Sequence, residues 1–129
     1  MPKKILIVDD DSAVVSLIKT RLEANHYEVV TATDGEDGLK KLKLYKPDLI
    51  ISDIMMPKMD GYSFVLEIKK IADFRNIPII ILTVKNTMQD IFIVEGAKEY
   101  ITKPFDDAVL LKKVEKFLKI ESNEKKSSV

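Results

Sequence analysis

Short, uninterrupted runs of aliphatic residues constrain the fold of this chain more than any other feature. Three of them span Ile5 to Val8, Leu49 to Ile51 and Ile79 to Leu82, with no alternating polar residues. Runs of this kind are typical of central strands in a parallel sheet, because such strands are buried on both faces. Two weaker runs, Tyr27 to Ala32 and Glu99 to Thr102, favour two further strands. The sequence therefore predicts five strands.

Helical patterns follow each of these runs. In the first, Val14, Ile18 and Leu22 fall at helical spacing, and Asp11 or Ser12 is a candidate N-cap. The five predicted helices cover residues 13–24, 35–46, 61–71, 88–95 and 107–120, with Asp34 and Asp60 as caps of the second and third. Strands that alternate with helices indicate βαβ units with right-handed crossovers. We expect an α/β fold with helices on both faces of a parallel sheet.

Composition narrows the class of protein. The 129 residues include 21 Lys and Arg and 21 Asp and Glu, so the formal net charge is zero. A neutral domain has no global field to attract nucleic acid or anionic lipid, and we expect no direct contact with either. No cysteine is present, which excludes disulfides and thiolate chemistry, and no apolar segment is long enough to span a bilayer. We therefore expect a cytoplasmic protein.

Residues 1–120 hold all five strand and helix pairs, and we expect them to form one domain. Residues 121–129 are polar and lack periodicity, which is typical of a flexible tail or a linker stub.

Reactive side chains stand at the carboxyl ends of four predicted strands. Asp9 and Asp10 follow the first, Asp53 ends the third, Thr83 ends the fourth and Lys103 follows the fifth. Ligands of open α/β sheets bind at this edge. Each residue alone has a structural explanation, since an aspartate there often caps the next helix and a Lys-Pro pair often makes a turn. Their joint occurrence favours a functional site.

The donor types predict the chemistry of that site. Three adjacent carboxylates repel one another, and a divalent cation relieves that repulsion. Oxygen donors without histidine or cysteine favour Mg²⁺ or Ca²⁺. An ammonium and a hydroxyl beside them would suit a phosphoryl group, with one carboxylate as its nucleophilic acceptor.

The motifs that carry these residues resemble the receiver domain of two-component response regulators. The matching stretches are residues 5–10, 53–57 with Asp60 and Gly61, 81–83 and 96–105. Each motif is weak alone, but together they are specific, and the resemblance spans residues 3–120. It implies a flavodoxin-like, doubly wound (βα)5 fold whose parallel sheet has the strand order 2-1-3-4-5.

The resemblance also implies roles for the residues of the site. Asp53 is similar to the phosphorylated aspartate of the family. Asp9 and Asp10 correspond to the acidic pair that holds Mg²⁺ with Asp53, and the backbone carbonyl of Met55 would be a further ligand. Lys103 corresponds to the lysine that contacts a phosphoryl oxygen, and its bond to Pro104 is expected to be cis.

Two further residues correspond to the family's switch. Thr83 is similar to the hydroxyl residue that moves toward the phosphoryl group, and Tyr100 to the aromatic residue that then changes rotamer. Val84 departs from the family pattern, in which a small residue follows the threonine, and we expect its branched side chain to narrow access to the site.

Partners follow from the same resemblance. A sensor histidine kinase or a phosphotransfer protein would donate the phosphoryl group. Helix four, strand five and helix five would form the surface for a downstream protein, a covalently linked output domain or a phosphorylation-dependent dimer. The apolar run Ile91 to Val94 cannot be buried by one helix face, so we expect part of it to contribute to that surface. The lysines of helix five are expected to form a solvated face.

Three alternatives compete with this interpretation. A haloacid-dehalogenase-type phosphohydrolase needs a second aspartate two residues after the nucleophile, where this chain has Met55. A flavin- or nucleotide-binding module needs a glycine- or hydroxyl-rich loop after the first strand, where this chain has three aspartates. A receiver that has lost its chemistry would not keep every reactive position. We therefore expect no enzyme activity beyond phosphorylation and dephosphorylation of the chain itself.

Overall fold

Five parallel strands form one sheet in the order β2-β1-β3-β4-β5, which confirms the predicted topology. The computed structural model describes residues 2–54, 61–83 and 97–118. The strands are β1 (Lys4–Val8), β2 (Glu28–Ala32), β3 (Leu49–Asp53), β4 (Ile79–Thr83) and β5 (Glu99–Thr102). The helices are α1 (Ser12–Ala24), α2 (Gly35–Tyr45), α3 (Gly61–Lys69) and α5 (Asp107–Leu118). The predicted apolar runs start within one residue of all five strands, and they stop two residues before the end of β3 and one residue before the end of β4.

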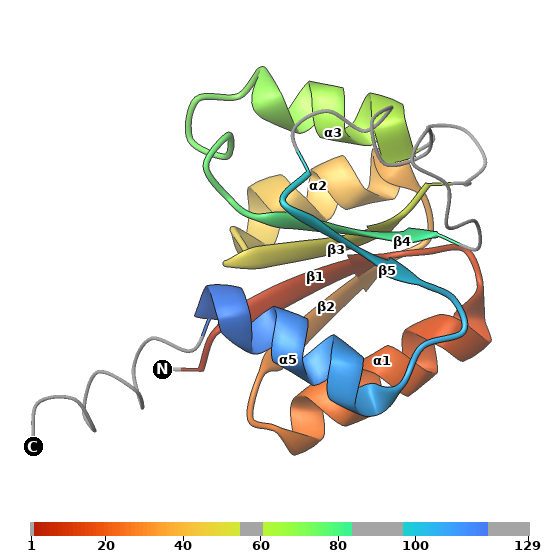
Figure 1. Cartoon of the computed structure of the whole chain (residues 1–129). Helices are drawn as coiled ribbons and strands as arrows, with labels where there is room; N and C mark the ends of the chain where they lie inside the picture. The colour runs from red at the N-terminus through yellow and green to blue at the C-terminus, as the bar shows by residue number, and fades with distance from the viewer. Residues whose placement is uncertain (1, 55–60, 84–96, 119–129) are drawn as a thin grey trace, which may run out of the picture.

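Helices cover both faces of the sheet, α2 and α3 on one and α1 and α5 on the other (Figure 1). Alternate residues of each strand serve the two layers: Ile5 and Ile7 pack with α1 and α5, whereas Leu6 and Val8 pack with α2 and α3. This double burial explains why the strands are continuous apolar runs, because neither face of a central strand meets water.

Caps set the starts of two helices as predicted. The Asp11 side chain accepts hydrogen bonds from the backbone N–H groups of Ala13 and Val14. The Asp34 side chain accepts one from the N–H of Asp37 at 2.8 Å. Both caps satisfy N–H groups that have no partner within the helix.

The third helix ends earlier than its apolar pattern predicted, at Lys69 rather than Ile71. A series of turns follows over residues 70–76, and the side chain of Phe74 is buried there against the layer that contains α3. Ile71 packs against the same layer from outside the helix. The apolar spacing therefore continued past the helix because the following turns use the same core.

Other expectations fall on residues that the structure does not describe. These are the fourth helix at residues 88–95 with Ile91 to Val94, the cap at Asp60, the carbonyl of Met55, the side chain of Val84 and the tail at 121–129. Of the helices that the structure does describe, none combines the length and apolar character needed to cross a bilayer.

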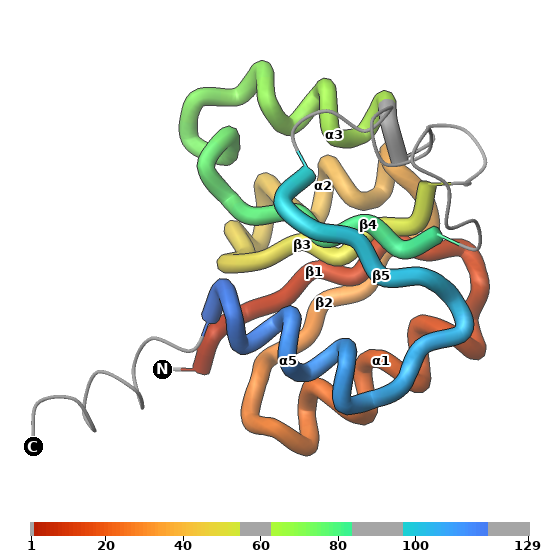
Figure 2. Tube along the Cα trace, viewed as in Figure 1, coloured from red at the N-terminus to blue at the C-terminus, as the bar shows by residue number. Residues whose placement is uncertain are grey.

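The chain begins and ends its described part at the same edge of the sheet. Figure 2 shows the start of β1 and the end of α5 on the left, the side where the parallel strands begin. The strands run from there toward the opposite edge, which is called the carboxyl edge below. The edge where the strands begin is called the amino edge.

Candidate functional site

Strand register brings the predicted reactive residues together at the carboxyl edge. Val8 of β1 lies opposite Ser52 of β3, so the next residues along the two strands, Asp9 and Asp53, are neighbours. Thr83 of β4 pairs with Thr102 of β5, and Lys103 follows immediately. Four separate segments therefore deliver these side chains to one place.

The three carboxylates form a compact cluster. One carboxylate oxygen from each of Asp9, Asp10 and Asp53 lies within 4.8 Å of the other two. Asp9 and Asp53 are buried, with 1% and 8% of their surface exposed, whereas Asp10 is exposed. The site is thus closed below by the sheet and open to solvent on the side of Asp10.

Lys103 supplies the positive charge among these acids. Its Nζ lies 2.9 Å from Oδ2 of Asp9 and 3.7 Å from Oδ1 of Asp53. Burial alone would lower the pKa of Lys103, but the hydrogen bond to Asp9 and the charges of Asp53, Asp9 and Asp11 outweigh it and raise the pKa above its ordinary value. The ammonium is therefore charged throughout the neutral range.

Hydrogen bonds to both carboxylate oxygens hold the side chain of Asp9 in place. Its Oδ1 accepts a hydrogen bond from the backbone N–H of Asp11 at 2.9 Å, and its Oδ2 accepts one from Lys103. Its own backbone N–H donates to the carbonyl of Ala32 at 3.1 Å. The carboxylate is thereby oriented before any ligand arrives.

The donor set fits a hard divalent cation. Three carboxylates from two adjacent strands provide oxygen donors, and among the residues that the structure describes no histidine joins the group. One lysine cannot balance three neighbouring negative charges, so a cation beside Asp10 would complete the charge of the site.

Thr83 and Tyr100 occupy different surroundings. Thr83 is buried at the end of β4, and its carbonyl accepts a hydrogen bond from the backbone N–H of Lys103 at 2.6 Å. Tyr100 lies at the other end of β5, half-buried, with Nζ of Lys113 5.9 Å from the centre of its ring. The structure places Thr83 beside the acidic cluster and Tyr100 away from it.

Two of the three lysines of α5 pair with a carboxylate, whereas all three were expected to form a solvated face. Nζ of Lys113 and Nζ of Lys116 lie 3.2 and 3.1 Å from the two carboxylate oxygens of Glu99 on β5. Burial raises the pKa of Glu99, but these hydrogen bonds and the charge of Lys113 prevail and lower it. Of Lys112, Lys113 and Lys116, only Lys112 is exposed without such a contact among the described residues.

Two long-range contacts, one at the site and one at the opposite end of β5, could not be found from sequence spacing. Lys103 and Asp9 are 94 positions apart, and Glu99 and Lys116 are 17 apart, so neither pair shares a helix face or a turn. The contact between Asp9 and Lys103 could be predicted only from the topology, because both residues follow a strand in an all-parallel sheet.

Cis geometry at the Lys103–Pro104 bond agrees with the expectation from the family resemblance. The bond follows β5 directly, so it lies beside the acidic cluster.

Comparison with known proteins agrees with this geometry. Residues 5–115 match the family model of the response regulator receiver domain. The alkaline phosphatase synthesis transcriptional regulatory protein PhoP of Bacillus subtilis is 43% identical over 107 residues, which cover 81% of this chain and 44% of PhoP. The chain thus spans about half or less of the length of the curated relatives it matches.

Solved structures give the same result over nearly their full length. The chemotaxis protein CheY4 of Vibrio cholerae superposes with a TM-score of 0.87 at 32% identity, covering 91% of this chain and 99% of that one. The receiver domain of the sensor histidine kinase PA1611 of Pseudomonas aeruginosa superposes with a TM-score of 0.84 at 28% identity, covering 91% and 98%. That structure has a magnesium ion coordinated in its active-site cleft. This chain belongs to the receiver domains of two-component response regulators.

Proposed function

We propose that this receiver domain is switched by phosphorylation of Asp53, with Mg²⁺ held by Asp9, Asp10 and Asp53. The observation that carries the proposal is the meeting of three carboxylate oxygens within 4.8 Å of one another, with the ammonium of Lys103 3.7 Å from Asp53. An acyl phosphate forms when a carboxylate oxygen of Asp53 attacks the phosphorus of a donor and the donor's leaving oxygen departs.

Each neighbouring residue has a defined task in this proposal. Asp9 is already oriented by Asp11 and Lys103, and Asp10 faces solvent, where a cation would arrive. The carbonyl of Met55 would complete the ligand set. Bound Mg²⁺ would supply positive charge that offsets the carboxylates and the phosphoryl oxygens. Lys103 would turn from Asp9 toward a phosphoryl oxygen on Asp53, so that its ammonium would exchange one anionic partner for another.

The switch would pass through Thr83 and Tyr100. The hydroxyl of Thr83 would bond a phosphoryl oxygen, and Tyr100 on the neighbouring strand would respond by changing rotamer. Lys113 lies over the ring of Tyr100 and also binds Glu99, so a rotamer change would disturb the contacts between β5 and α5. Val84 would restrict the access of donors and water to Asp53.

The partners that suit this proposal are those of a signalling module. A sensor histidine kinase or a phosphotransfer protein would donate the phosphoryl group in the cytoplasm. The surface of helix four, β5 and α5 would then contact a downstream protein, a linked output domain or a second copy of the chain. The formal net charge of zero supports a receiver domain that does not itself bind nucleic acid. The chemistry would be confined to Asp53, without a separate substrate.

Labelling with acetyl phosphate tests this proposal. The chain should gain one phosphoryl group in the presence of Mg²⁺ and none with a chelator, and Asp10→Asn should suppress the gain. Asp53→Asn should abolish labelling, while Asp73→Asn, a matched change in the exposed loop after α3, should label as the parent does. Equal labelling of the Asp53→Asn and Asp73→Asn proteins would overturn the assignment.

A further inference from the structure

Two charged side chains of α2 hold the end of β2. Asp37 and Lys41 lie one turn apart on α2, and Nζ of Lys41 is 3.6 Å from Oδ2 of Asp37. The same Oδ2 accepts a hydrogen bond from the backbone N–H of Thr33 at 3.2 Å. Nζ of Lys41 also donates to the carbonyl of Thr31 at 2.7 Å. The pair of Asp37 and Lys41, called the α2 clamp below, therefore binds the chain on both sides of Ala32.

The peptide unit between Ala32 and Thr33 connects the α2 clamp to the acidic cluster. Its N–H group belongs to Thr33 and donates to Asp37. Its C=O group belongs to Ala32 and accepts the backbone N–H of Asp9 at 3.1 Å. A peptide unit is planar, so the direction of its N–H group fixes the direction of its C=O group. A carboxylate on the N–H side also polarises the unit, which makes the C=O group a stronger acceptor. Asp37 therefore acts on the N–H of Asp9 across a single rigid group.

The backbone of Asp9 depends on this anchor because it lies where β1 ends. The register pairs of β1 with β2 end at Val8 and Ala32, so the hydrogen bond from Asp9 lies just beyond the last pair. The carboxylate of Asp9 meets those of Asp10 and Asp53 within 4.8 Å to form the cluster. Because a side chain moves with the backbone that carries it, a loosened end of β1 would displace one of the three oxygen donors.

We propose that Asp37 is a positioning residue for Asp9, braced by Lys41, and that it raises the affinity of the acidic cluster for a divalent cation. Only the cation rests on the proposed function, since the hydrogen bonds between α2 and β2 are present without it. Asp37 acts through the peptide unit and is not itself one of the three clustered carboxylates. The competing explanation is that Asp37 only stabilises the start of α2, where the helix dipole favours acids. Two matched positions separate these explanations.

Glu36 is the control for the helix, because it lies in the same first turn of α2 as Asp37 and is exposed. Amide hydrogen exchange, measured by NMR without Mg²⁺, should be several-fold faster at Asp9 in Asp37→Ala than in the parent chain. Exchange at Ile7, in the middle of β1, should be unchanged. Glu36→Ala should leave both amides as in the parent, and Asp37→Asn, which keeps an acceptor oxygen, should fall between. Equal exchange at Asp9 in Asp37→Ala and Glu36→Ala, or equal acceleration at Asp9 and Ile7, would overturn the proposal.

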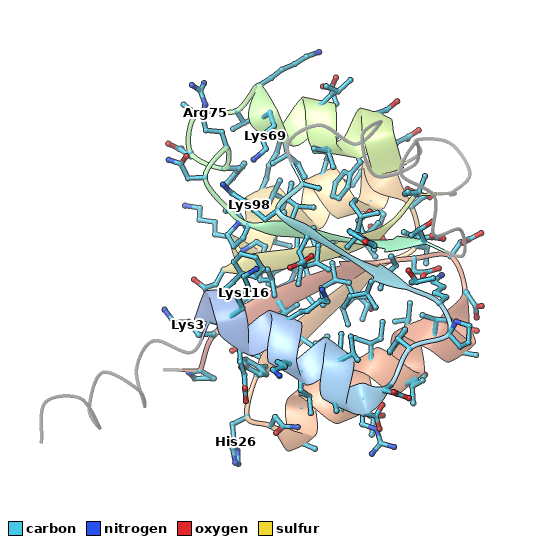
Figure 3. The ribbon with its side chains drawn as sticks, in the orientation of Figure 1. Lys3, His26, Lys69, Arg75, Lys98 and Lys116 are labelled. Atoms are coloured by element: carbon cyan, nitrogen blue, oxygen red, sulfur yellow. The ribbon has the colours of Figure 1, made fainter. Side chains whose placement is uncertain are left out.

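Glu28 is the control for the strand pair. Its carboxylate lies 3.6 Å from Nζ of Lys4, and its N–H donates to the carbonyl of Lys3 at 2.9 Å. These contacts lie at the opposite end of β1 and β2, on the left of Figure 3, where Lys3 is labelled.

A titration followed by backbone amide shifts should give a Kd for Mg²⁺ that is several-fold higher in Asp37→Ala than in the parent, because residues that orient metal ligands influence affinity. The Kd should be unchanged in Glu28→Gln. An unchanged Kd in Asp37→Ala, beside a parent that binds Mg²⁺, would overturn the proposal. A parent that binds none would instead contradict the proposed function, and the exchange at Asp9 would still decide the role of Asp37.

Discussion

The charged groups at the two edges of the sheet differ in their burial and in how they are paired. At the carboxyl edge Asp9, Asp53 and Lys103 are largely buried and in mutual contact. At the amino edge Lys69 is half-buried, whereas Lys98 and Lys46 are exposed. Both edges are built from the same strands and helices, so topology alone does not explain the contrast.

Helix polarity explains the signs of the charges. In a parallel α/β fold the helices begin at the carboxyl edge and end at the amino edge, and their partial positive ends favour acids. Accordingly Asp11 and Asp34 cap helices at the first edge, and Arg21 and Lys43 lie in last turns at the second. The sign of the charged side chains at the helix ends therefore follows from helix polarity. A reactive site needs burial in addition, because charges interact strongly only where water is excluded. The four changes below test that difference.

Lys103→Met should have the largest effect on stability. Removing the ammonium leaves Asp9 and Asp53 facing each other without a cation, and breaking such a buried pair costs about 3 kcal/mol. Urea denaturation with a chelator present would measure the loss, and added Mg²⁺ should recover part of it. The matched change at the amino edge, Lys98→Met, should alter the free energy of unfolding little. Equal losses from the two changes would remove the distinction between the edges.

Asp34→Ala should cost about 1 kcal/mol, the usual contribution of an N-cap. Its carboxylate is buried and accepts from the N–H of Asp37 at 2.8 Å, so the variant leaves that N–H without this partner. Thermal unfolding would report the change, with Asp73→Ala as the exposed control. A loss no greater than that of the control would show that the start of α2 does not depend on this cap.

Glu99→Gln tests an ion-pair cluster at the amino edge. The lowered pKa of Glu99 means that its carboxylate stabilises the folded state at neutral pH, and that this stability is lost as the pH falls below the ordinary value of 4.5 through the lowered one. We expect the variant to be less stable by about 0.5 kcal/mol near pH 7, since the pairs are partly exposed. The difference should disappear in acid, and a difference that is constant with pH would refute this account.

Lys46→Gly should have an effect as small as that of Glu99→Gln, with the opposite sign. Lys46 caps the end of α2 with φ 49 and ψ 65, a left-handed conformation that glycine adopts more readily. A gain of about 0.5 kcal/mol is expected from the relief of strain. The same change at Lys43, inside α2, should instead lose about 1 kcal/mol. If both variants are destabilised alike, the backbone at Lys46 is not strained.

Much of the carboxyl edge could be predicted from the sequence because it depends on strand ends. Continuous apolar runs locate the ends of β1, β3 and β4 to within two residues, and the residues that end or follow parallel strands must meet at one edge. Asp9, Asp10, Asp53 and Lys103 were therefore assembled correctly without a structure. The N-cap at Asp34 could be predicted from the sequence equally well, because it depends only on neighbours within four residues.

The amino edge could not be predicted in the same way. Glu99 meets Lys113 and Lys116 only because α5 packs back across β5, which no local pattern encodes. Phe74 is buried from a run of turns after α3, and turns do not repeat with a helical period. Contacts between distant segments cannot be predicted in this way when the two segments do not end strands at the same edge of the sheet.

Peptide mapping of the phosphorylated chain tests the central claim most directly. After reaction with acetyl phosphate and Mg²⁺, the acid-labile phosphoryl group should be found on the peptide that contains Asp53, and the peptide that contains Asp9 and Asp10 should carry none. The phosphoryl group should also be absent when Mg²⁺ is withheld. A phosphoryl group mapped to any residue other than Asp53 would contradict the account.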